Sequence, residues 1–228
     1  MELNKYIDHT NLKAYAKEED IIKLCHEAIE YNFESVVVNP HYITLAKDCL
    51  KDTFINVTTV VGFPLGASTM ETKVYEAIDA IEKGADEIDM VANIGAIKDG
   101  DYEYVKKEIS DILYSIDGKP LKVIIETCYL TKEEIEEMTK ICSELFVNYI
   151  KTSTGYGPRG ATLEDIDIIN SAKNEALQVK ASGGITTYED AMKFIEKGVT
   201  RIGTSNGVEI MRGESNETIW WFKMERIN

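Results

Sequence analysis

Short apolar runs alternate with longer amphipathic segments along the whole chain. The short runs are rich in β-branched residues, and they do not alternate between apolar and polar positions with period two. Continuous runs such as Val36-Val37-Val38 and Val123-Ile124-Ile125 are typical of strands that are covered on both faces, as in a parallel sheet. Eight strands are predicted, at Tyr6–His9, Ser35–Asn39, Ile55–Val61, Glu87–Asn93, Leu121–Glu126, Phe146–Lys151, Gln178–Ala181 and Arg201–Thr204.

The segments between these runs carry helix start and stop signals. Ser68 to Glu71 and Thr131 to Glu134 are capping-box sequences, in which a hydroxyl and a carboxylate satisfy free backbone amides. Thr162 and Thr187 are also predicted N-caps, each followed three residues later by an aspartate. Gly84 and Gly198 occupy matching places in two similar helix-to-strand segments, 81–88 and 195–202, where a left-handed C-cap is expected.

Eight strands, each followed by a helix, predict a single-domain α/β fold of the (β/α)8 TIM-barrel type. We expect the barrel to span residues 1–213 and a C-terminal tail of unknown role to span 214–228. The tail contains Trp220-Trp221-Phe222 and is expected to pack on the barrel or at an oligomer interface. A doubly wound open sheet is the alternative, but no G-x-G-x-x-G motif follows the first strand.

Composition narrows the possible partners. The 228 residues carry a formal net charge of −15, which disfavours binding to nucleic acid and to anionic membrane surfaces. An anionic small substrate would therefore need a locally electropositive pocket. The four cysteines form no C-x-x-C pair, the N-terminus has no apolar signal region, and no apolar run reaches the ~18–20 residues that span a bilayer. We expect a cytoplasmic protein.

Three charged residues stand at or within the apolar strands. Chemistry in such barrels lies at the C-terminal ends of the strands, where Lys151 ends one run and Lys180 lies near the end of the next. Neighbouring parallel strands are ~4.8 Å apart, so two inward lysines at similar height would repel each other and leave one amine neutral, and a neutral amine can attack a carbonyl. Asp89 is a carboxylate inside an apolar strand and must be paired or functional. The alternatives are that Lys151 is an edge lysine before a loop, that Lys180 points outward, and that Asp89 is a structural ion-pair partner.

Two glycine-rich loops predict a phosphate site. Ser182-Gly183-Gly184 and Gly203-Thr204-Ser205-Asn206 follow the last two strands, where barrels commonly bind phosphate through backbone amides. Paired glycines that only form a turn are the alternative. His9 is expected near the barrel mouth, but it has no partners at metal-ligand spacing, so no metal is assigned. Glu126 is the rival to Asp89 as the acid.

An ordered set of motifs from Tyr6 to Gly213 resembles the deoxyribose-phosphate aldolases, a family of class I aldolases. The motifs are Ile7-Asp8-His9-Thr10-Asn11-Leu12, Val38-Asn39-Pro40, Val61-Gly62-Phe63-Pro64-Leu65-Gly66, Glu87-Ile88-Asp89-Met90-Val91, Ile150-Lys151-Thr152-Ser153-Thr154-Gly155-Tyr156-Gly157-Pro158, Lys180-Ala181-Ser182-Gly183-Gly184-Ile185 and Ile202-Gly203-Thr204-Ser205. The resemblance implies a cofactor-free, reversible cleavage of 2-deoxy-D-ribose 5-phosphate to D-glyceraldehyde 3-phosphate and acetaldehyde, in deoxyribonucleoside catabolism. It also implies a homo-oligomer, either a dimer or a tetramer.

The resemblance implies a role for each matching residue. Lys151 would form the Schiff base, Lys180 would lower its pKa and aid proton transfer, and Asp89 would shuttle protons. The remaining residues would bind the substrate and its phosphate or line the pocket: Asp8, Thr10, Leu12, Thr154, Gly183, Gly184, Gly203, Ser205 and Asn206. Asn206 stands where relatives more often have a small residue. No tyrosine follows Tyr188, so the group that protonates the enamine stays open.

Two other functions remain possible at this point. The same mouth would suit another Schiff-base aldolase or a transaldolase that acts on a different sugar phosphate. A barrel that binds a sugar phosphate without turning it over would also carry these loops.

Overall fold

The eight strands form one closed parallel sheet. In the computed structural model, which describes residues 2–214, each strand pairs with the next, and the eighth pairs with the first through Ile7 opposite Ile202. The predicted barrel is confirmed, and the open sheet is excluded. The strands are β1 (Ile7–Asn11), β2 (Ser35–Val38), β3 (Asn56–Val61), β4 (Glu87–Val91), β5 (Leu121–Ile124), β6 (Tyr149–Lys151), β7 (Gln178–Ser182) and β8 (Arg201–Thr204).

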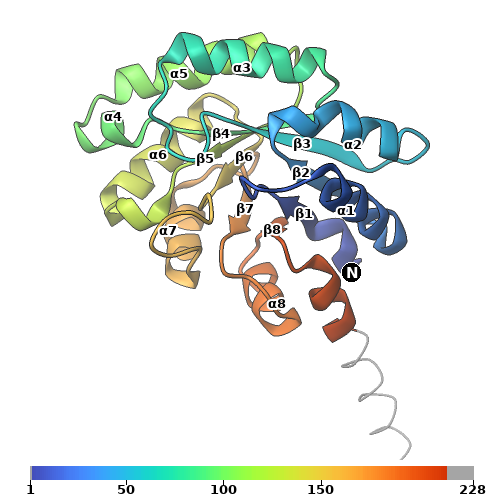
Figure 1. Cartoon of the computed structure of the whole chain (residues 1–228). Helices are drawn as coiled ribbons and strands as arrows, with labels where there is room; N and C mark the ends of the chain where they lie inside the picture. The colour runs from blue at the N-terminus through green and yellow to red at the C-terminus, as the bar shows by residue number, and fades with distance from the viewer. Residues whose placement is uncertain (1, 215–228) are drawn as a thin grey trace, which may run out of the picture.

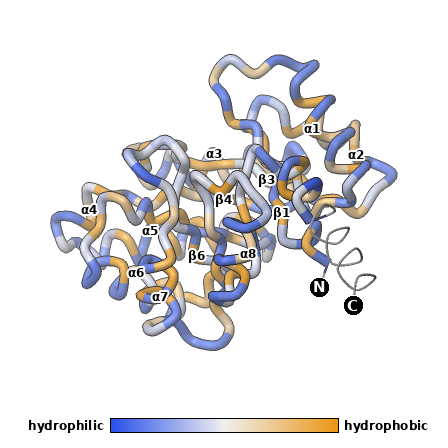
Figure 2. The backbone as a smooth tube through the Cα atoms, turned by 90° about the horizontal axis from the view of Figure 1, so that it is seen from below, coloured by the Kyte–Doolittle hydropathy of each residue, from blue (hydrophilic) through white to orange (hydrophobic). Residues whose placement is uncertain are grey.

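Helices surround this sheet on the outside (Figure 1). Along them, hydrophobic and hydrophilic stretches alternate, as expected when one face of a helix packs on the strands (Figure 2). After β8 the chain is helical over residues 207–214. The α-helices are α1 (Glu18–Tyr31), α2 (Ile43–Leu50), α3 (Met70–Glu82), α4 (Ile94–Lys98), α5 (Tyr102–Ser115), α6 (Lys132–Glu144), α7 (Leu163–Ala172) and α8 (Tyr188–Glu196), and short 3₁₀ helices span η1 (Leu3–Tyr6), η2 (Pro40–Tyr42) and η3 (Thr127–Tyr129).

The predicted helix caps are confirmed with one exception. The hydroxyl of Thr131 accepts a hydrogen bond from the backbone amide of Glu134, and Thr162 and Thr187 act in the same way. The exception is Ser68, because α3 begins one residue later and Thr69 is its N-cap. Gly84 and Gly198 have φ angles of 100° and 85°, in the left-handed region that was predicted for both.

Most predicted strands have a boundary that is off by one or two residues: β4 ends at Val91 and not at Asn93, and β5 ends at Ile124 and not at Glu126. The largest error concerns Phe146. Phe146 was assigned to the strand that ends at Lys151, but β6 begins at Tyr149. Phe146 has a φ of 56° and its side chain is 79% exposed. It lies in the left-handed turn that ends α6, where its amide donates to the carbonyl of Ser143. Phe146 is therefore an apolar residue that is neither part of a strand nor buried.

The apolar core lies between the strands and the helices. It contains the outward-facing strand residues, such as Val36, Ile88 and Val123, packed against helix residues such as Ile21 and Ile109. The interior of a TIM barrel is usually filled with layers of branched aliphatic side chains. In this barrel several interior positions carry buried charges instead, which is the feature that organises the site.

A separate buried ion pair anchors the strand that carries Asp89. Lys73 on α3 and Glu108 on α5 are both fully buried, and the lysine Nζ lies 2.7 Å from Oε1 of Glu108. Lys73 also donates to the carbonyl of Val91, while Glu108 accepts from the amide of Asn93. The two helices therefore fix the backbone just after β4 from the outside.

Two sequence predictions concern membrane-spanning segments and the C-terminal tail. No helix within residues 2–214 is long and apolar enough to cross a membrane. The aromatic segment Trp220-Trp221-Phe222, with nearly all of the predicted tail, lies outside the described residues.

Candidate active site

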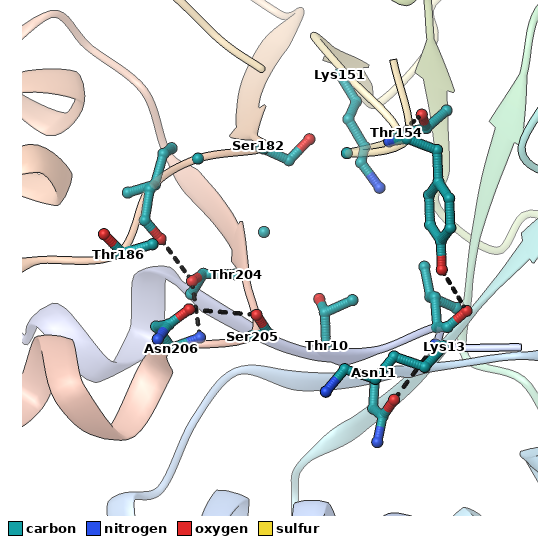
Figure 3. Close-up of a pocket in the computed structure, with 17 residues that line it drawn as sticks. Thr10, Asn11, Lys13, Lys151, Thr154, Ser182, Thr186, Thr204, Ser205 and Asn206 are labelled. Atoms are coloured by element: carbon teal, nitrogen blue, oxygen red, sulfur yellow. Dashed lines mark hydrogen bonds between the residues drawn. The ribbon is translucent and has the colours of Figure 1, made fainter. Parts of the chain in front are cut away.

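A cavity of about 310 Å³ opens at the C-terminal ends of β1, β6, β7 and β8. It is bordered by the loops that follow these strands, and Lys151 points its Nζ into it from one side (Figure 3). Thr204, Ser205 and Asn206 lie across the cavity from Lys151 (Figure 3). The residues lining it are Thr10, Asn11, Leu12, Lys13, Lys151, Thr154, Gly155, Tyr156, Ser182, Gly183, Gly184, Ile185, Thr186, Gly203, Thr204, Ser205 and Asn206.

Lys151 is the last residue of β6 and sits at the bottom of this cavity. Its side chain is 5% exposed, and its Nζ lies 2.7 Å from Oδ2 of Asp89 on β4. In the sheet, Lys151 pairs with Lys180 on β7. The two lysines are therefore at the same height in the barrel, as the sequence predicted.

Lys180 and Asp89 adjoin Lys151 in the barrel interior and are fully buried. The Nζ of Lys180 is also 2.7 Å from Oδ2 of Asp89, so a single carboxylate oxygen contacts both lysines. Strands β4 and β7 are not neighbours, so this contact crosses the barrel interior. The structure thus brings together all three residues that the sequence singled out for catalysis.

The pKa of Lys151 is lowered to about 8. Burial is the largest cause, because it penalises the charged ammonium. The carboxylate of Asp89 opposes the shift, whereas the positive charges of Lys180 and Lys122 reinforce it. A substantial fraction of neutral amine is then present near physiological pH, and the neutral form is the nucleophile.

The sequence analysis did not identify three further charged residues in the barrel interior: Glu87, Lys122 and Arg201. The Nζ of Lys122 lies 3.0 Å from Oδ1 of Asp89 and 2.5 Å from Oε2 of Glu87. Nη2 of Arg201 is 3.3 Å from Oε1 of Glu87. The available signal was a single charge inside an apolar strand, the same signal that drew attention to Asp89.

Asp8 completes this interior cluster. It was expected to line the pocket, but it is fully buried and lies below the cavity. Asp8 precedes Thr10 by two residues, so both side chains face inward and Asp8 lies one layer deeper. Its Oδ1 is 2.6 Å from Nη1 of Arg201, and its Oδ2 is 2.5 Å from Nζ of Lys180.

The interior cluster contains more cations than carboxylates. Three carboxylates (Asp8, Glu87 and Asp89) face four cations (Lys122, Lys151, Lys180 and Arg201), and all seven are at least 94% buried. Buried charges need compensation, and the one further carboxylate near the cluster, Glu34, lies 3.8 Å from Nη2 of Arg201 with its side chain 31% exposed, so it compensates the extra positive charge only in part. A neutral Lys151 removes the imbalance, which gives the lowered pKa of Lys151 a structural reason.

The two aspartates of the cluster remain ionised. Burial alone would raise the pKa of Asp89, but Lys122, Lys151 and Lys180 outweigh it and hold this pKa well below its ordinary value. For Asp8 burial is likewise outweighed, chiefly by Arg201 and then by Lys180, so its pKa is lowered too. Asp89 is therefore a permanent anion that can accept a proton only transiently.

The predicted phosphate loops border the cavity. Gly183, Gly184, Gly203, Ser205 and Asn206 all line it. Gly183 and Gly184 have φ angles of 84° and 79°, which L-residues with side chains rarely adopt. The loops are held by short contacts: Thr204 donates its hydroxyl proton to the carbonyl of Ile185, and the amide of Asn206 donates to Oγ1 of Thr204. Asn206 precedes the helical residues 207–214.

Gly160 supports the Gly183 loop from the neighbouring segment. A Cβ atom on Gly160 would lie 2.0 Å from the carbonyl oxygen of Gly183, which is far inside van der Waals contact. The amide of Ala161 donates to the carbonyl of Ser182 at the same place. The β6–α7 and β7–α8 loops are thus packed backbone to backbone.

Thr10, Leu12 and Thr154 also line the cavity, as expected. Thr154 is held by Glu126, whose carboxylate accepts hydrogen bonds from both the backbone amide and the hydroxyl of Thr154. Glu126, the rival acid, is 3% exposed, has a φ of 50° and is not among the lining residues. It orders the loop that carries Thr154 and does not face the cavity.

His9 does not lie at the mouth as expected. Successive side chains on a strand point to opposite faces, so His9 points outward between the inward-facing Asp8 and Thr10. Its Nε2 lies 2.8 Å from Oε2 of Glu27 on α1. Within residues 2–214, no group of three or more His, Cys, Asp or Glu side chains is arranged to hold a metal ion.

Comparisons with known proteins agree on one family. The model of a family described as "DeoC/LacD family aldolase" matches residues 3–213. A deoxyribose-phosphate aldolase of Thermococcus gammatolerans is 53% identical over 220 residues, covering 95% of this chain and 98% of that protein. A deoxyribose-phosphate aldolase of a Thermoanaerobacter species is 51% identical over 92% of this chain and 96% of its own length.

Solved structures give the same picture. An aldolase named QR15 superposes with a TM-score of 0.91 at 39% identity, and the match covers 95% of this chain and 97% of that one. A deoxyribose phosphate aldolase from Aeropyrum pernix, described as a unique tetrameric structure, superposes with a TM-score of 0.87 at 30% identity over 93% of this chain and 91% of its own.

Proposed function

The chain belongs to the DeoC/LacD family of aldolases, and on that premise we propose that it is a deoxyribose-phosphate aldolase that works through a Schiff base on Lys151. It would cleave 2-deoxy-D-ribose 5-phosphate reversibly to D-glyceraldehyde 3-phosphate and acetaldehyde. The observation that carries this proposal is the position of Lys151, a buried lysine with a lowered pKa whose Nζ points into a cavity bordered by glycine loops.

The first step is the attack of neutral Lys151 on the aldehyde carbon of the open-chain sugar. The resulting carbinolamine loses water and forms a protonated imine. The leaving hydroxyl needs a proton, and Lys180 can supply it because its Nζ adjoins the same Asp89 oxygen as Lys151. Asp89 keeps the two amines in contact and stabilises the positive charge on the imine nitrogen.

The second step is cleavage between C2 and C3 of the sugar. A base removes the proton of the C3 hydroxyl, the C2–C3 bond breaks, and its electron pair moves to the imine nitrogen. D-glyceraldehyde 3-phosphate leaves, and an enamine remains on Lys151. Protonation of the enamine carbon and hydrolysis of the imine then release acetaldehyde and restore the free lysine. No metal or organic cofactor enters this sequence of steps.

The phosphate of the substrate would sit on the glycine loops. All five loop residues that would hold it line the cavity, and Ser205 and Asn206 lie across it from Lys151, so a sugar bound between them would reach from Lys151 to the loops. Backbone amides suit this task because they bind an anion without adding net charge. Asp8 would act from below, since it contacts Lys180 and does not line the cavity.

The assembly and the cellular role follow from the same proposal. One solved relative is described as tetrameric, and we propose that this chain also forms a homo-oligomer. We further propose a cytoplasmic role in deoxyribonucleoside catabolism, because the reaction turns a deoxysugar phosphate into a triose phosphate and a two-carbon aldehyde.

Reductive trapping tests the proposal. Incubation with acetaldehyde and borohydride, followed by peptide mass spectrometry, is expected to give one ethylated lysine, Lys151. The Lys151→Met variant should lose both the label and the turnover of deoxyribose 5-phosphate, whereas Lys23→Met, a change at an exposed lysine outside the cavity, should keep both.

Two results would refute parts of the proposal. A label on another lysine, or no label, would reject Lys151 as the nucleophile. Faster turnover of fructose 6-phosphate than of deoxyribose 5-phosphate would indicate a transaldolase-type activity at the same mouth. Tight binding of the sugar phosphate without turnover would indicate a binding protein.

A further inference from the structure

The lining of the cavity has an unusual charge composition for this chain. The sequence has 40 acidic and 25 basic residues, yet no carboxylate is found among the cavity-lining residues that the structure describes. The only charged residues in that lining are Lys13 and Lys151. The lining of the cavity therefore carries no negative side chain although the protein is strongly negative, and its two amines belong to lysines.

These two lysines differ in their surroundings. Lys151 is buried at the bottom, contacts Asp89 and carries the chemistry. Lys13 is exposed on the β1–α1 loop, and no carboxylate lies within ion-pair distance of it in the described part of the chain. Its Nζ lies 5.9 Å from the centre of the Tyr15 ring. Lys13 thus carries a positive charge at the mouth that is not neutralised by a neighbouring side chain.

The backbone around Lys13 is held in place across the cavity. The hydroxyl of Tyr156, on the β6–α7 loop, donates to the carbonyl of Leu12 at 2.7 Å. The Leu12 side chain packs in a small apolar cluster with Val37 and Val60. The Lys13 amide donates to Oδ1 of Asn11. An ordered backbone reduces the entropy that is lost when a lysine engages a ligand.

Lys13 also lines the same cavity as the predicted phosphate loops. β1 is the neighbour of β8 in the sheet, and Figure 3 shows Thr10 next to Ser205, with Asn11 and Lys13 further along the same side of the cavity. Backbone amides on those loops would bind a phosphate but would not neutralise its negative charge. Lysine is a compact point charge that commonly binds phosphate.

We propose that Lys13 determines specificity for phosphorylated sugars, by closing the cavity mouth over the substrate's phosphate and supplying the cation that the glycine loops lack. This inference rests on the proposed aldolase function and adds to it a residue outside the glycine loops. It also explains how a chain with a net charge of −15 attracts an anionic substrate.

The test compares a phosphorylated and a neutral substrate in the full-length protein. The ratio of kcat/KM for 2-deoxyribose 5-phosphate to that for 2-deoxyribose is measured in wild type, Lys13→Met, Lys13→Arg and Lys17→Met. Lys17 is the matched control, because it is an exposed lysine four residues away that pairs with Glu19 and does not line the cavity.

In Lys13→Met the ratio is expected to fall roughly tenfold, mainly through a higher KM for the phosphorylated sugar. Lys13→Arg should restore most of it, and Lys17→Met should match wild type. Added salt should lower the wild-type ratio more than the Lys13→Met ratio. An unchanged ratio, or an equal loss on both sugars, would overturn the inference.

A binding measurement separates this inference from the proposed function. Calorimetric titration with inorganic phosphate needs no turnover. If wild type cleaves neither sugar, the aldolase proposal fails. The role of Lys13 is then decided by phosphate affinity, which Lys13→Met should weaken roughly tenfold relative to Lys17→Met. Equal phosphate affinity in the two variants would reject Lys13 as part of the phosphate site.

Discussion

Replacing Lys180 with methionine isolates the electrostatic part of the lowered pKa of Lys151. The Nζ atoms of Lys151 and Lys180 each lie 2.7 Å from the same oxygen of Asp89, so they are at most about 5.4 Å apart. At an effective dielectric constant of about 20, two unit charges about 5 Å apart repel each other by about 3 kcal/mol. That energy corresponds to a pKa difference of about two.

Lys180→Met is therefore expected to raise the pKa of Lys151 from about 8 to about 10. The sign is that of a removed cation: without Lys180, protonation of Lys151 meets less repulsion, and Asp89 has one cation fewer to stabilise. The neutral fraction of Lys151 at pH 7.5 should then fall roughly a hundredfold.

The assay is the rate of acetaldehyde trapping on Lys151 with cyanoborohydride, followed by intact-protein mass between pH 6 and pH 11. The midpoint of this profile reports the pKa of the attacking amine. Lys180→Arg keeps the charge and should keep the wild-type midpoint, and thermal unfolding checks that each variant is folded. If the Lys180→Met midpoint stays near the wild-type value, Lys180 does not lower the pKa of Lys151 and the repulsion argument is wrong.

Two further predictions follow from the described geometry. Lys151→Met should be more stable than wild type by an amount that is largest below pH 8 and shrinks as the pH rises towards 10.5, because in that window the unfolded lysine still binds a proton that the folded lysine has lost. Urea unfolding at pH 7 and pH 10 measures this difference. A gain in stability that does not depend on pH would contradict the prediction. Gly160→Ala places a Cβ against the Gly183 carbonyl, so it should cost about 1–3 kcal/mol of stability and raise the KM for the phosphorylated sugar. Gly95→Ala, whose Cβ would meet only the Asn93 side chain at 3.3 Å, is its control; equal effects of the two changes would contradict the loop-support role of Gly160.

The sequence was most informative where one physical rule decided the outcome. Continuous apolar runs require cover on both faces, and that requirement placed all eight strands. Lys151 and Lys180 were located because the C-terminal ends of parallel strands share one face of the barrel. Thr131 was recognised because its hydroxyl and Glu134 stand at the required spacing.

The residues missed or misplaced needed information that a local pattern does not contain. Lys122 and Arg201 are single charges in short strands, and the sequence does not state which face of the strand is the interior. Asp8 was assigned to the pocket wrongly, because its depth in the barrel depends on the register between neighbouring strands, which a local sequence pattern does not contain. Ser68 and Thr69 are adjacent hydroxyls, and only the exact start of α3 distinguishes them.

The ion pair between Asp8 and Arg201 has a consequence for folding. The two residues are 193 positions apart, on the first and last strands, so their contact requires almost the whole chain to be in place. Closing a loop of that length costs roughly 5 kcal/mol of chain entropy. Arg201 is also the partner that Asp8 and Glu87 share across the interior. Before β8 docks, these carboxylates lack that partner and retain their water. The ion pairs of Arg201 therefore make closure of the barrel and compensation of its buried carboxylates depend on each other.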